Sequence, residues 1–303
     1  MALDAAALTL FAEIHTPDAT PAREHPRALV TISLGAQYLA RWRALAEAGF
    51  RAYAERHGYD AILIACHLDR SWRALKRSPA WQKCLILSQP WSQGYERIVW
   101  IDADCVSKAE APDVCEGIPV ECVGANSVFE QLSDVELEIL IERRYGFRAA
   151  TRDARAAFAA VQGEVYRTDG FADPPATMMH TGVLVLSPAH HRGLLEAAYA
   201  YESANRWYEQ TALSYLALKA GLMRGFSPRF NWLLDLVLQQ EMPHQDVSLT
   251  AAALAAREPH LCGTIRAQWS KCHFLHLGER VWRAAGGADH PATRTLADMF
   301  GQP

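Results

Sequence analysis

The first third of the chain contains three short, almost wholly apolar runs separated by segments with helical character. The runs cover residues 28–34, 61–65 and 97–101, and runs of this length are typical of strands buried on both faces of a sheet. Residues 80–89 have the pattern of a short helix closed by Pro90. Between the first two runs, apolar residues recur at helical spacing: Leu39, Trp42, Leu45, Ala46, Phe50 and Tyr53. Gly58 follows them, and a glycine at this point typically ends a helix. This β-α-β-α-β order predicts an α/β fold with a mostly parallel central sheet flanked by helices.

Beyond this unit, the pattern predicts further strands and helices around one long insertion. Residues 126–176 are helical and charged and then rich in Pro and Asp, and we interpret them as an insertion that covers the ligand-binding edge of the sheet. Further strands are expected at 119–124, 181–187 and 272–277, and helices at about 190–204 and 208–220. A single domain would therefore span 28–283, between a loosely held N-terminal arm (1–27) and a loosely held C-terminal tail (284–303).

The bulk composition excludes several classes of protein. The net charge is −4 and the basic residues are scattered, whereas a nucleic-acid-binding protein usually carries a basic stripe. No apolar window reaches the roughly 18 residues needed to span a bilayer, and the N-terminus lacks the pattern of a secretory signal. The seven cysteines form no C-x-x-C pair and fit reduced thiols. We therefore expect a cytoplasmic protein, free or peripheral at the inner membrane face, with no nucleic-acid partner and no transmembrane segment.

Two carboxylates, Asp102 and Asp104, follow directly after the apolar run at 97–101. Ligands bind outside the carboxyl ends of the strands in parallel sheets, so both side chains are expected at a ligand site. Hard cations such as Mg²⁺ and Mn²⁺ prefer oxygen ligands and share them with phosphates, and in sugar transfer they stabilise the charge on the departing diphosphate. An Asp-x-Asp after a strand is also typical of a turn or of a helix cap. A metal site and a structural turn therefore both fit these residues alone.

Six motifs in a fixed order extend the argument beyond the two carboxylates. They are the apolar run at 28–34, W-Q-K at 81–83, I-D-A-D at 101–104, H-T-G-V-L-V at 180–185, Y-E-Q-T-A at 208–212 and H-L-G at 276–278. Over roughly residues 28 to 282, the chain resembles the GT-A glycosyltransferases with a D-x-D motif. It is similar to the retaining families that include glycogenin, the bacterial lipopolysaccharide galactosyltransferases, and the yeast and plant α-galactosyl- and xylosyltransferases. The resemblance implies a Rossmann-like GT-A fold with a helical insertion after the D-x-D motif.

The resemblance also implies a metal site. Asp104 would bind a Mn²⁺ or Mg²⁺ ion directly, Asp102 would contact the metal or the ribose, and a late histidine would complete the site. Residues three apart on a strand point to opposite faces, so only one of His273 and His276 can reach the metal. We favour His276, because an apolar run precedes it and Gly278 follows it.

Further matching positions are expected around the nucleotide-sugar donor. Lys83 would contact the diphosphate or the sugar, and Gly182 would let the backbone approach the donor closely. Gln210 would lie near the anomeric carbon of the sugar, with Glu209 beside it. His180 stands where the families usually have Asn, and Glu209 where they usually have Asp, so the identity of the donor sugar stays open.

Two hydroxyl side chains complete the donor-facing set. Thr31 and Ser33 alternate on one face of the first strand and are expected to contact the nucleotide. Ordinary buried hydroxyls would give the same pattern, so the sequence leaves both interpretations open.

Together these residues predict a metal-dependent hexosyltransferase. It would move a hexose from a UDP-sugar, UDP-galactose or UDP-glucose, to an acceptor hydroxyl with retention of configuration. The acceptor would be a glycan, a lipid-linked sugar, a protein or a small molecule, and the sequence does not choose among them. Two alternatives stay open: a haloacid-dehalogenase-type phosphatase that uses Asp102 and Asp104, and a non-catalytic protein that binds sugar nucleotides.

Overall fold

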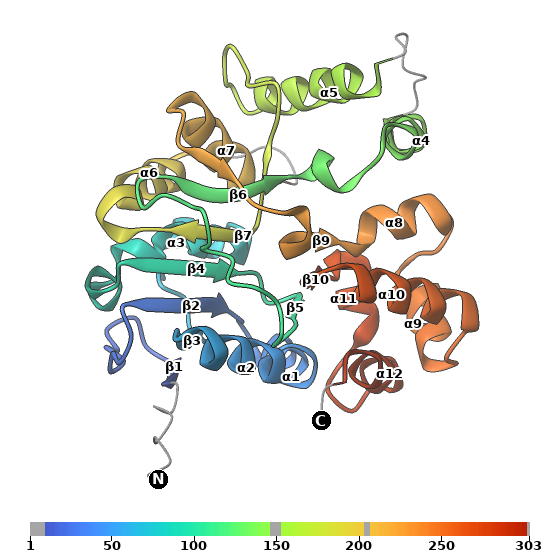
Figure 1. The fold of residues 1–303 in the computed structure, drawn as a ribbon, viewed down its shortest axis with the longest axis horizontal. Helices are drawn as coiled ribbons and strands as arrows, with labels where there is room; N and C mark the ends of the chain where they lie inside the picture. Colours follow the sequence, from blue (N-terminus) through green and yellow to red (C-terminus); the bar gives the residue numbers. More distant parts are fainter. Residues whose placement is uncertain (1–9, 146–152, 203–206, 302–303) are drawn as a thin grey trace.

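The computed structural model describes residues 10–145, 153–202 and 207–301, and its centre is a seven-stranded sheet (Figure 1). In spatial order the strands are β1 (Phe11–Ile14), β3 (Asp60–Ile64), β2 (Arg27–Ile32), β4 (Arg97–Ile101), β7 (Met179–Leu186), β6 (Val123–Ser127) and β8 (Met223–Gly225). The first four are mutually parallel, β7 is antiparallel to β4 and β6, and β6 is parallel to β8. Because only β7 is reversed, the expected α/β class with a mostly parallel sheet is confirmed.

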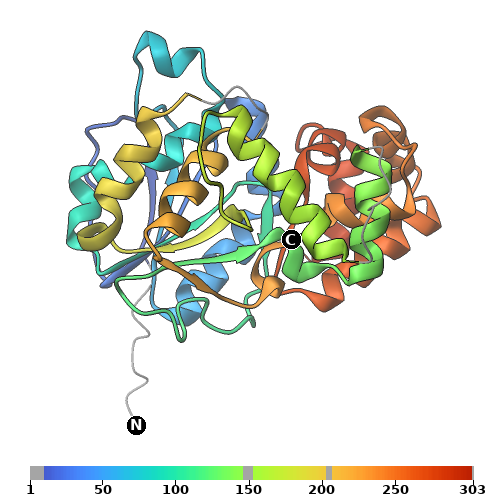
Figure 2. The same ribbon diagram turned by 90° about the horizontal axis from the view of Figure 1, so that it is seen from above.

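Helices cover both faces of this sheet (Figure 2). The central strands are buried on both sides, so neighbouring residues such as Leu29 and Val30 pack into different cores. The Val30 side is covered by η1 (Pro79–Ser88), η2 (Pro90–Gly94), α6 (Pro188–Ala200) and α7 (Glu209–Lys219). The Leu29 side is covered by α1 (Ala36–Leu45), α2 (Glu47–His57), a second sheet and the C-terminal helices. A short helix, α3 (Trp72–Leu75), stands between β3 and η1 in the chain.

The second sheet has three short strands, β5 (Cys105–Ser107), β10 (Phe274–His276) and β9 (Trp232–Leu233). β10 pairs antiparallel with β5 and parallel with β9. Its register places His276 opposite Cys105, the residue after Asp104. This sheet therefore joins the end of β4 to a segment about 170 residues further along the chain.

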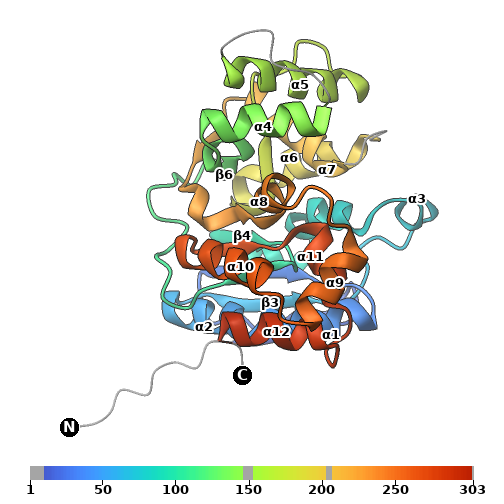
Figure 3. The same ribbon diagram turned by 90° about the vertical axis from the view of Figure 1, so that its right-hand side faces the viewer.

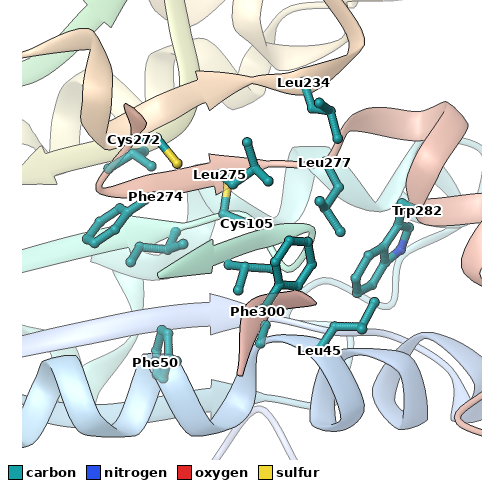
Figure 4. Packing of buried hydrophobic residues seen from close by; sticks show 14 of the residues in the cluster. Leu45, Phe50, Cys105, Leu234, Cys272, Phe274, Leu275, Leu277, Trp282 and Phe300 are labelled. Carbon is teal, nitrogen blue, oxygen red and sulfur yellow. The ribbon is translucent and has the colours of Figure 1, made fainter. Parts of the chain in front are cut away.

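The C-terminal third packs as a helical layer beside the small sheet (Figure 3). Trp282 from this layer lies beside Leu277 and Leu45 of α1, and Phe300 lies near Cys105 in the same core (Figure 4). The layer contains α8 (Leu234–Glu241), α9 (Val247–Ala255), α10 (Pro259–Lys271), α11 (Gly278–Ala285) and α12 (Pro291–Phe300), preceded by η4 (Pro228–Asn231).

The expected helical insertion after the carboxylate pair is also present. It contains η3 (Val128–Gln131), α4 (Asp134–Tyr145) and α5 (Ala154–Thr168). Leu140 and Phe158 pack with Leu236 of α8, so the insertion closes over the side of the molecule where the strands end.

The structure differs from the sequence-based expectation in three elements. β1 and α12 lie in the segments expected to be a loose arm and tail, yet β1 pairs with β3 and Leu296 of α12 is fully buried. The strand expected at 119–124 begins only at Val123, because Pro119 to Cys122 form a hydrogen-bonded turn. The short helix expected at 80–89 is present as a 3₁₀ helix over residues 79–88. Parts of the expected arm, insertion, helix at 190–204 and tail lie outside the described residues.

Two findings bear on the expected cellular setting. Within the described ranges, no helix combines the length and apolar character that crossing a bilayer requires. All seven cysteines are free thiols.

Candidate active site

The two predicted carboxylates lie at the carboxyl end of β4 and line a cavity of about 320 Å³. The backbone N–H of Asp102 donates to the carbonyl of Gly182 at 2.7 Å, so the chain is held to β7 immediately after the strand ends. The indole N–H of Trp100 donates to Asp102 Oδ1 at 2.7 Å. These contacts fix Asp102 at the cavity wall rather than in a solvent-exposed turn.

Asp104 is paired with His276 across the small sheet. Asp104 Oδ1 lies 3.3 Å from His276 Nε2, and candidate ligand atoms of Asp104, His276 and Cys105 lie within 4.8 Å of one another. His273 is on the other side of the strand, with its ring 4.7 Å from that of Phe230. The structure therefore brings His276, and not His273, to the carboxylate pair.

Asn231 determines which nitrogen of His276 faces the cavity. Its amide Nδ2 donates to Asn126 Oδ1 and to the carbonyl of His180, both at 3.2 Å. Because both partners accept, Asn231 Oδ1 faces His276 Nδ1 at 3.0 Å, and Nδ1 must carry a proton. Nε2, on the side of Asp104, is then the nitrogen whose lone pair can bind a metal.

Charge reinforces the pair between Asp104 and His276. Burial lowers the pKa of His276, but the Asp104 carboxylate outweighs it and holds this pKa well above its usual value. Burial likewise raises the pKa of Asp104, yet His276 keeps it below its usual range. Burial raises the pKa of Cys105 to about 11, so Cys105 is a thiol at neutral pH. Cys105 is not among the residues that line the cavity, so the candidate ligands facing it are the Asp104 oxygens and a His276 nitrogen.

A buried lysine links Asp102 to Glu209 beside the cavity. Lys83 Nζ lies 2.9 Å from Asp102 Oδ1 and 2.9 Å from Glu209 Oε1, and donates to the carbonyl of Thr181 at 3.1 Å. Burial lowers the pKa of Lys83, but the two carboxylates outweigh it and raise this pKa above its usual value. The cluster thus holds one permanent cation beside Asp102.

Glu209 has one oxygen bound and one oxygen free among the described residues. Thr181 Oγ1 and Lys83 both bind Oε1, whereas the buried Oε2 has no hydrogen-bond partner in the described part of the chain. Burial raises the pKa of Glu209, and Lys83 offsets this only in part. A buried oxygen without a donor is costly, and a bound hydroxyl would satisfy it.

The remaining donor-facing candidates also line the cavity. Gln210 Oε1 accepts from the backbone N–H of Thr181 at 3.3 Å, which fixes its side chain. The His180 ring stacks on His276, with centroids 4.9 Å apart and planes 12° apart. Burial lowers the pKa of His180 well below its usual value, so His180 is neutral. Gly182 leaves room for this stack, since a Cβ there would lie 2.6 Å from His276 Nδ1.

Thr31 and Ser33 are not brought to this cavity wall. Both are buried around the end of β2, and neither hydroxyl has a hydrogen-bond partner in the ranges that the structure covers. Their role toward a nucleotide stays a prediction.

Two important residues had not been singled out in the sequence. Asn231 orients His276, and Asp235 on α8 lines the cavity with its Oδ1 buried 3.9 Å from Arg280 Nε. Burial raises the pKa of Asp235. Neither residue belongs to a local motif; the only sequence signal is their place in an otherwise aromatic and apolar stretch, residues 230–238.

Comparisons with known proteins give no family assignment. No model of a known protein family matches the chain, and no curated protein matches it. Among solved structures, the chain is similar to a glycosyltransferase involved in glycosylation of the major capsid of PBCV-1, with 13% identity and a TM-score of 0.45 over 85% of this chain and 97% of that one. It is also similar to the galactosyltransferase LgtC in complex with donor and acceptor sugar analogs, with 12% identity and a TM-score of 0.44 over 90% of this chain and 95% of that one. A third similar structure is mouse xyloside xylosyltransferase 1, with 12% identity and a TM-score of 0.41 over 83% of this chain and 97% of that one. At such values, the activity must be argued from the site itself.

Proposed function

We propose that this protein is a metal-dependent glycosyltransferase that moves a hexose from a nucleotide diphosphate sugar, UDP-galactose or UDP-glucose, to an acceptor hydroxyl. One observation carries the proposal. The pair of Asp104 and His276 lies at the carboxyl end of β4 in the same cavity as Asp102, Glu209 and Gln210. Candidate cation ligands and a set of buried hydrogen-bonding groups thus share one cavity, an arrangement that would serve transfer of a sugar from a diphosphate.

Asp104 and His276 would hold the divalent cation, with Asp102 at its edge. The carboxylate oxygens favour Mn²⁺ or Mg²⁺, and an imidazole ligand favours Mn²⁺ over Mg²⁺. When bound, the ion would neutralise charge on the diphosphate leaving group. Lys83 adds a fixed cation beside Asp102 without needing to reorganise.

Glu209, Gln210 and His180 would contact the sugar ring. Glu209 Oε2 and the neutral His180 ring offer acceptor and donor capacity for sugar hydroxyls. We propose transfer with retention, in which the departing diphosphate oxygen takes the proton of the acceptor hydroxyl. Glu209 is the carboxylate that could instead act as a nucleophile. Substantial turnover by Glu209→Gln would exclude that route.

The acceptor would enter between the insertion and α8. Asp235 supplies a buried carboxylate there, and Leu140, Phe158 and Leu236 supply an apolar wall. An acceptor hydroxyl could satisfy Asp235 Oδ1, the buried oxygen that lacks a donor within the described ranges. A hydroxyl next to an apolar body is therefore the acceptor chemistry that this wall favours.

The alternatives fit the site less well. A haloacid-dehalogenase-type phosphatase usually carries its Asp-x-Asp after the first strand, whereas β2 and β3 precede β4 here. A non-catalytic sugar-nucleotide-binding protein would share the geometry, and only turnover separates it from an enzyme.

A thermal-shift screen of nucleotide sugars with and without Mn²⁺ tests the proposal. A ligand that binds the native state raises the melting temperature by mass action. We expect one UDP-sugar to raise it in the presence of Mn²⁺, EDTA to abolish the rise, and UDP release to follow on incubation. A rise in melting temperature that EDTA does not abolish would contradict the proposed metal site. Binding without any UDP release would favour the non-catalytic alternative.

A further inference from the structure

The α3 segment stands out from the body of the molecule and exposes two large apolar side chains. Both rotated views show it projecting beyond the neighbouring elements, in cyan in Figure 2 and labelled in Figure 3. Trp72 is 71% exposed and Leu75 is 60% exposed. Among the large hydrophobic residues that the structure describes, Trp72 has the greatest exposed fraction. Exposing these two apolar side chains to water is unfavourable in free energy. A binding partner that covers them would remove this cost.

The projection is held in place rather than hanging as a free loop. Ser71 caps α3 by accepting from the backbone N–H of Ala74. Arg73 donates to Glu202 Oε1 at 2.6 Å and to the carbonyl of Ala200 at 2.7 Å. Arg77 donates to the carbonyl of Tyr199 at 2.8 Å. Trp72 and Leu75 are thus presented in a fixed orientation, so little ordering entropy is lost on binding.

The same segment is the most basic part of an acidic chain. Residues 70–77 contain Arg70, Arg73, Lys76 and Arg77 and no Asp or Glu, whereas the whole chain has a net charge of −4. Glu202 offsets part of this charge through its ion pairs with two of these arginines. Lys76 Nζ lies 4.8 Å from the centre of the Trp72 ring. Arg70 and Lys76 are therefore the exposed cations beside the apolar tip, whereas Arg73 and Arg77 are engaged by Glu202 and by carbonyls at the end of α6.

We propose that α3 docks the protein on an anionic phospholipid surface. Trp prefers the level of the lipid headgroups, Leu inserts among the first acyl carbons, and Lys and Arg pair with lipid phosphates. A protein partner fits less well, since a stable protein interface takes about 800 Å² from each side, and α3 offers only two apolar side chains on four residues. The charge and the small apolar tip both match a bilayer.

Docking through α3 would bring the bilayer near the cavity. The basic segment leads directly into η1, where Ala80 lines the cavity and Lys83 belongs to its ion cluster. This proposal does not depend on the transferase activity, because it rests on surface residues outside the cavity.

Vesicle co-sedimentation tests the proposal. The full chain would be mixed with vesicles of phosphatidylcholine alone and of phosphatidylcholine with about 30% phosphatidylserine. We expect binding to the anionic vesicles only, weakened by added salt because the attraction is screened. We expect the double variant Trp72→Ser, Leu75→Ser to bind at least about tenfold more weakly, and Lys76→Glu at least about fivefold more weakly, at roughly one kcal/mol per surface charge.

Leu249→Ser is the matched control, because Leu249 on α9 is also an exposed apolar residue, 54% exposed. It should bind vesicles like the wild type. Unchanged melting temperatures would show that the variants fold. If the double variant does not fold, the Lys76→Glu variant still tests the proposal. Failure of the wild type to bind anionic vesicles at low salt, or equal binding by the wild type and the Lys76→Glu variant, would overturn the proposal.

Discussion

Replacing Gly182 by Ala tests the close packing around His276, the proposed metal-binding histidine. A Cβ at position 182 would lie 2.6 Å from both Cε1 and Nδ1 of His276 and 2.9 Å from Asn231 Oδ1. Nonbonded heavy atoms prefer separations of about 3.5–4.0 Å, so the His276 ring or β7 must move by about 1 Å. Overpacking of a buried site by one methyl costs about 1–3 kcal/mol. We expect the free energy of unfolding to fall by that amount.

The same shift would also disturb the proposed cation site. His276 Nε2 is directed at Asp104 only while Nδ1 keeps its contact with Asn231. Disturbing the orientation of a ligand typically lowers metal affinity by about 10–100-fold. We therefore expect a loss of Mn²⁺ affinity in this range, measured by electron paramagnetic resonance of free Mn²⁺ at fixed nucleotide concentration. Urea unfolding followed by tryptophan fluorescence would give the stability change.

Gly225→Ala provides a matched control on β8 of the same sheet. A Cβ at Gly225 would meet no atom within 4 Å, so stability should change by no more than about 0.5 kcal/mol and Mn²⁺ affinity should not change. If Gly182→Ala loses stability but binds Mn²⁺ like the wild type, His276 is not a metal ligand. If Gly182→Ala changes neither the stability nor the Mn²⁺ affinity, His276 does not approach β7 as closely as we infer.

Three further perturbations have expected outcomes. Lys83→Met leaves the carboxylates of Asp102 and Glu209 buried without their cation, so it should cost about 3–5 kcal/mol in urea unfolding; adding Glu209→Gln should recover part of this loss, and no recovery would refute the pairing. Asn231→Ala should lower Mn²⁺ affinity by about 10–100-fold in the same titration, because the oriented tautomer of His276 is lost. Burial raises the pKa of Asp113, but Tyr59 and Arg27 outweigh burial and hold this pKa below its usual value. The stabilising contribution of Asp113 is therefore present above the unfolded pKa and is lost as pH falls through the folded pKa. Asp113→Asn should lower the free energy of unfolding by about 1–3 kcal/mol at pH 7 and by less in acid, and a loss that does not change with pH would exclude this linkage.

The parts of the fold that could be predicted from the sequence are those that local composition determines. β2, β3 and β4 are continuous apolar runs because both of their faces are covered, and that pattern is unambiguous over a few residues. The position of Asp102 and Asp104 followed from the end of β4 and from chain order. Their common cavity with Glu209 and Gln210 is consistent with the expected arrangement.

The elements that were misjudged depend on contacts with distant parts of the chain. α12 is small and polar in composition, yet Thr293 and Thr295 are buried beside Leu296. In the structure, α12 begins at Pro291 and is capped by the side chain of His290, which accepts from the backbone N–H of Ala292. β1 is a four-residue edge strand whose burial comes from β3 and not from its own pattern. In both cases tertiary packing overrides what local sequence indicates.

The residues that orient the site could not be found locally for the same reason. Asn231 links β6, β7 and β10 through Asn126, His180 and His276, and these residues lie far apart along the chain. An isolated Asn between Phe and Trp carries no mark of this role. Only the folded geometry shows that one amide holds three strands and selects the tautomer of the histidine.

The register of a three-residue ladder determines whether Asp104 and His276 can form the proposed cation site. A slip of one residue between β5 and β10 would turn His276 to the opposite face of the strand and bring its neighbour to Asp104. Backbone bonds flank the ladder on both sides, from Leu277 N–H to the Asp104 carbonyl at 2.9 Å and from Lys108 N–H to the His273 carbonyl at 3.1 Å. Since Leu277 and Phe274 are fully buried in the core that the C-terminal helices complete, a slip would also expose apolar surface. The same packing that buries the C-terminal third therefore fixes the geometry of the proposed metal ligands.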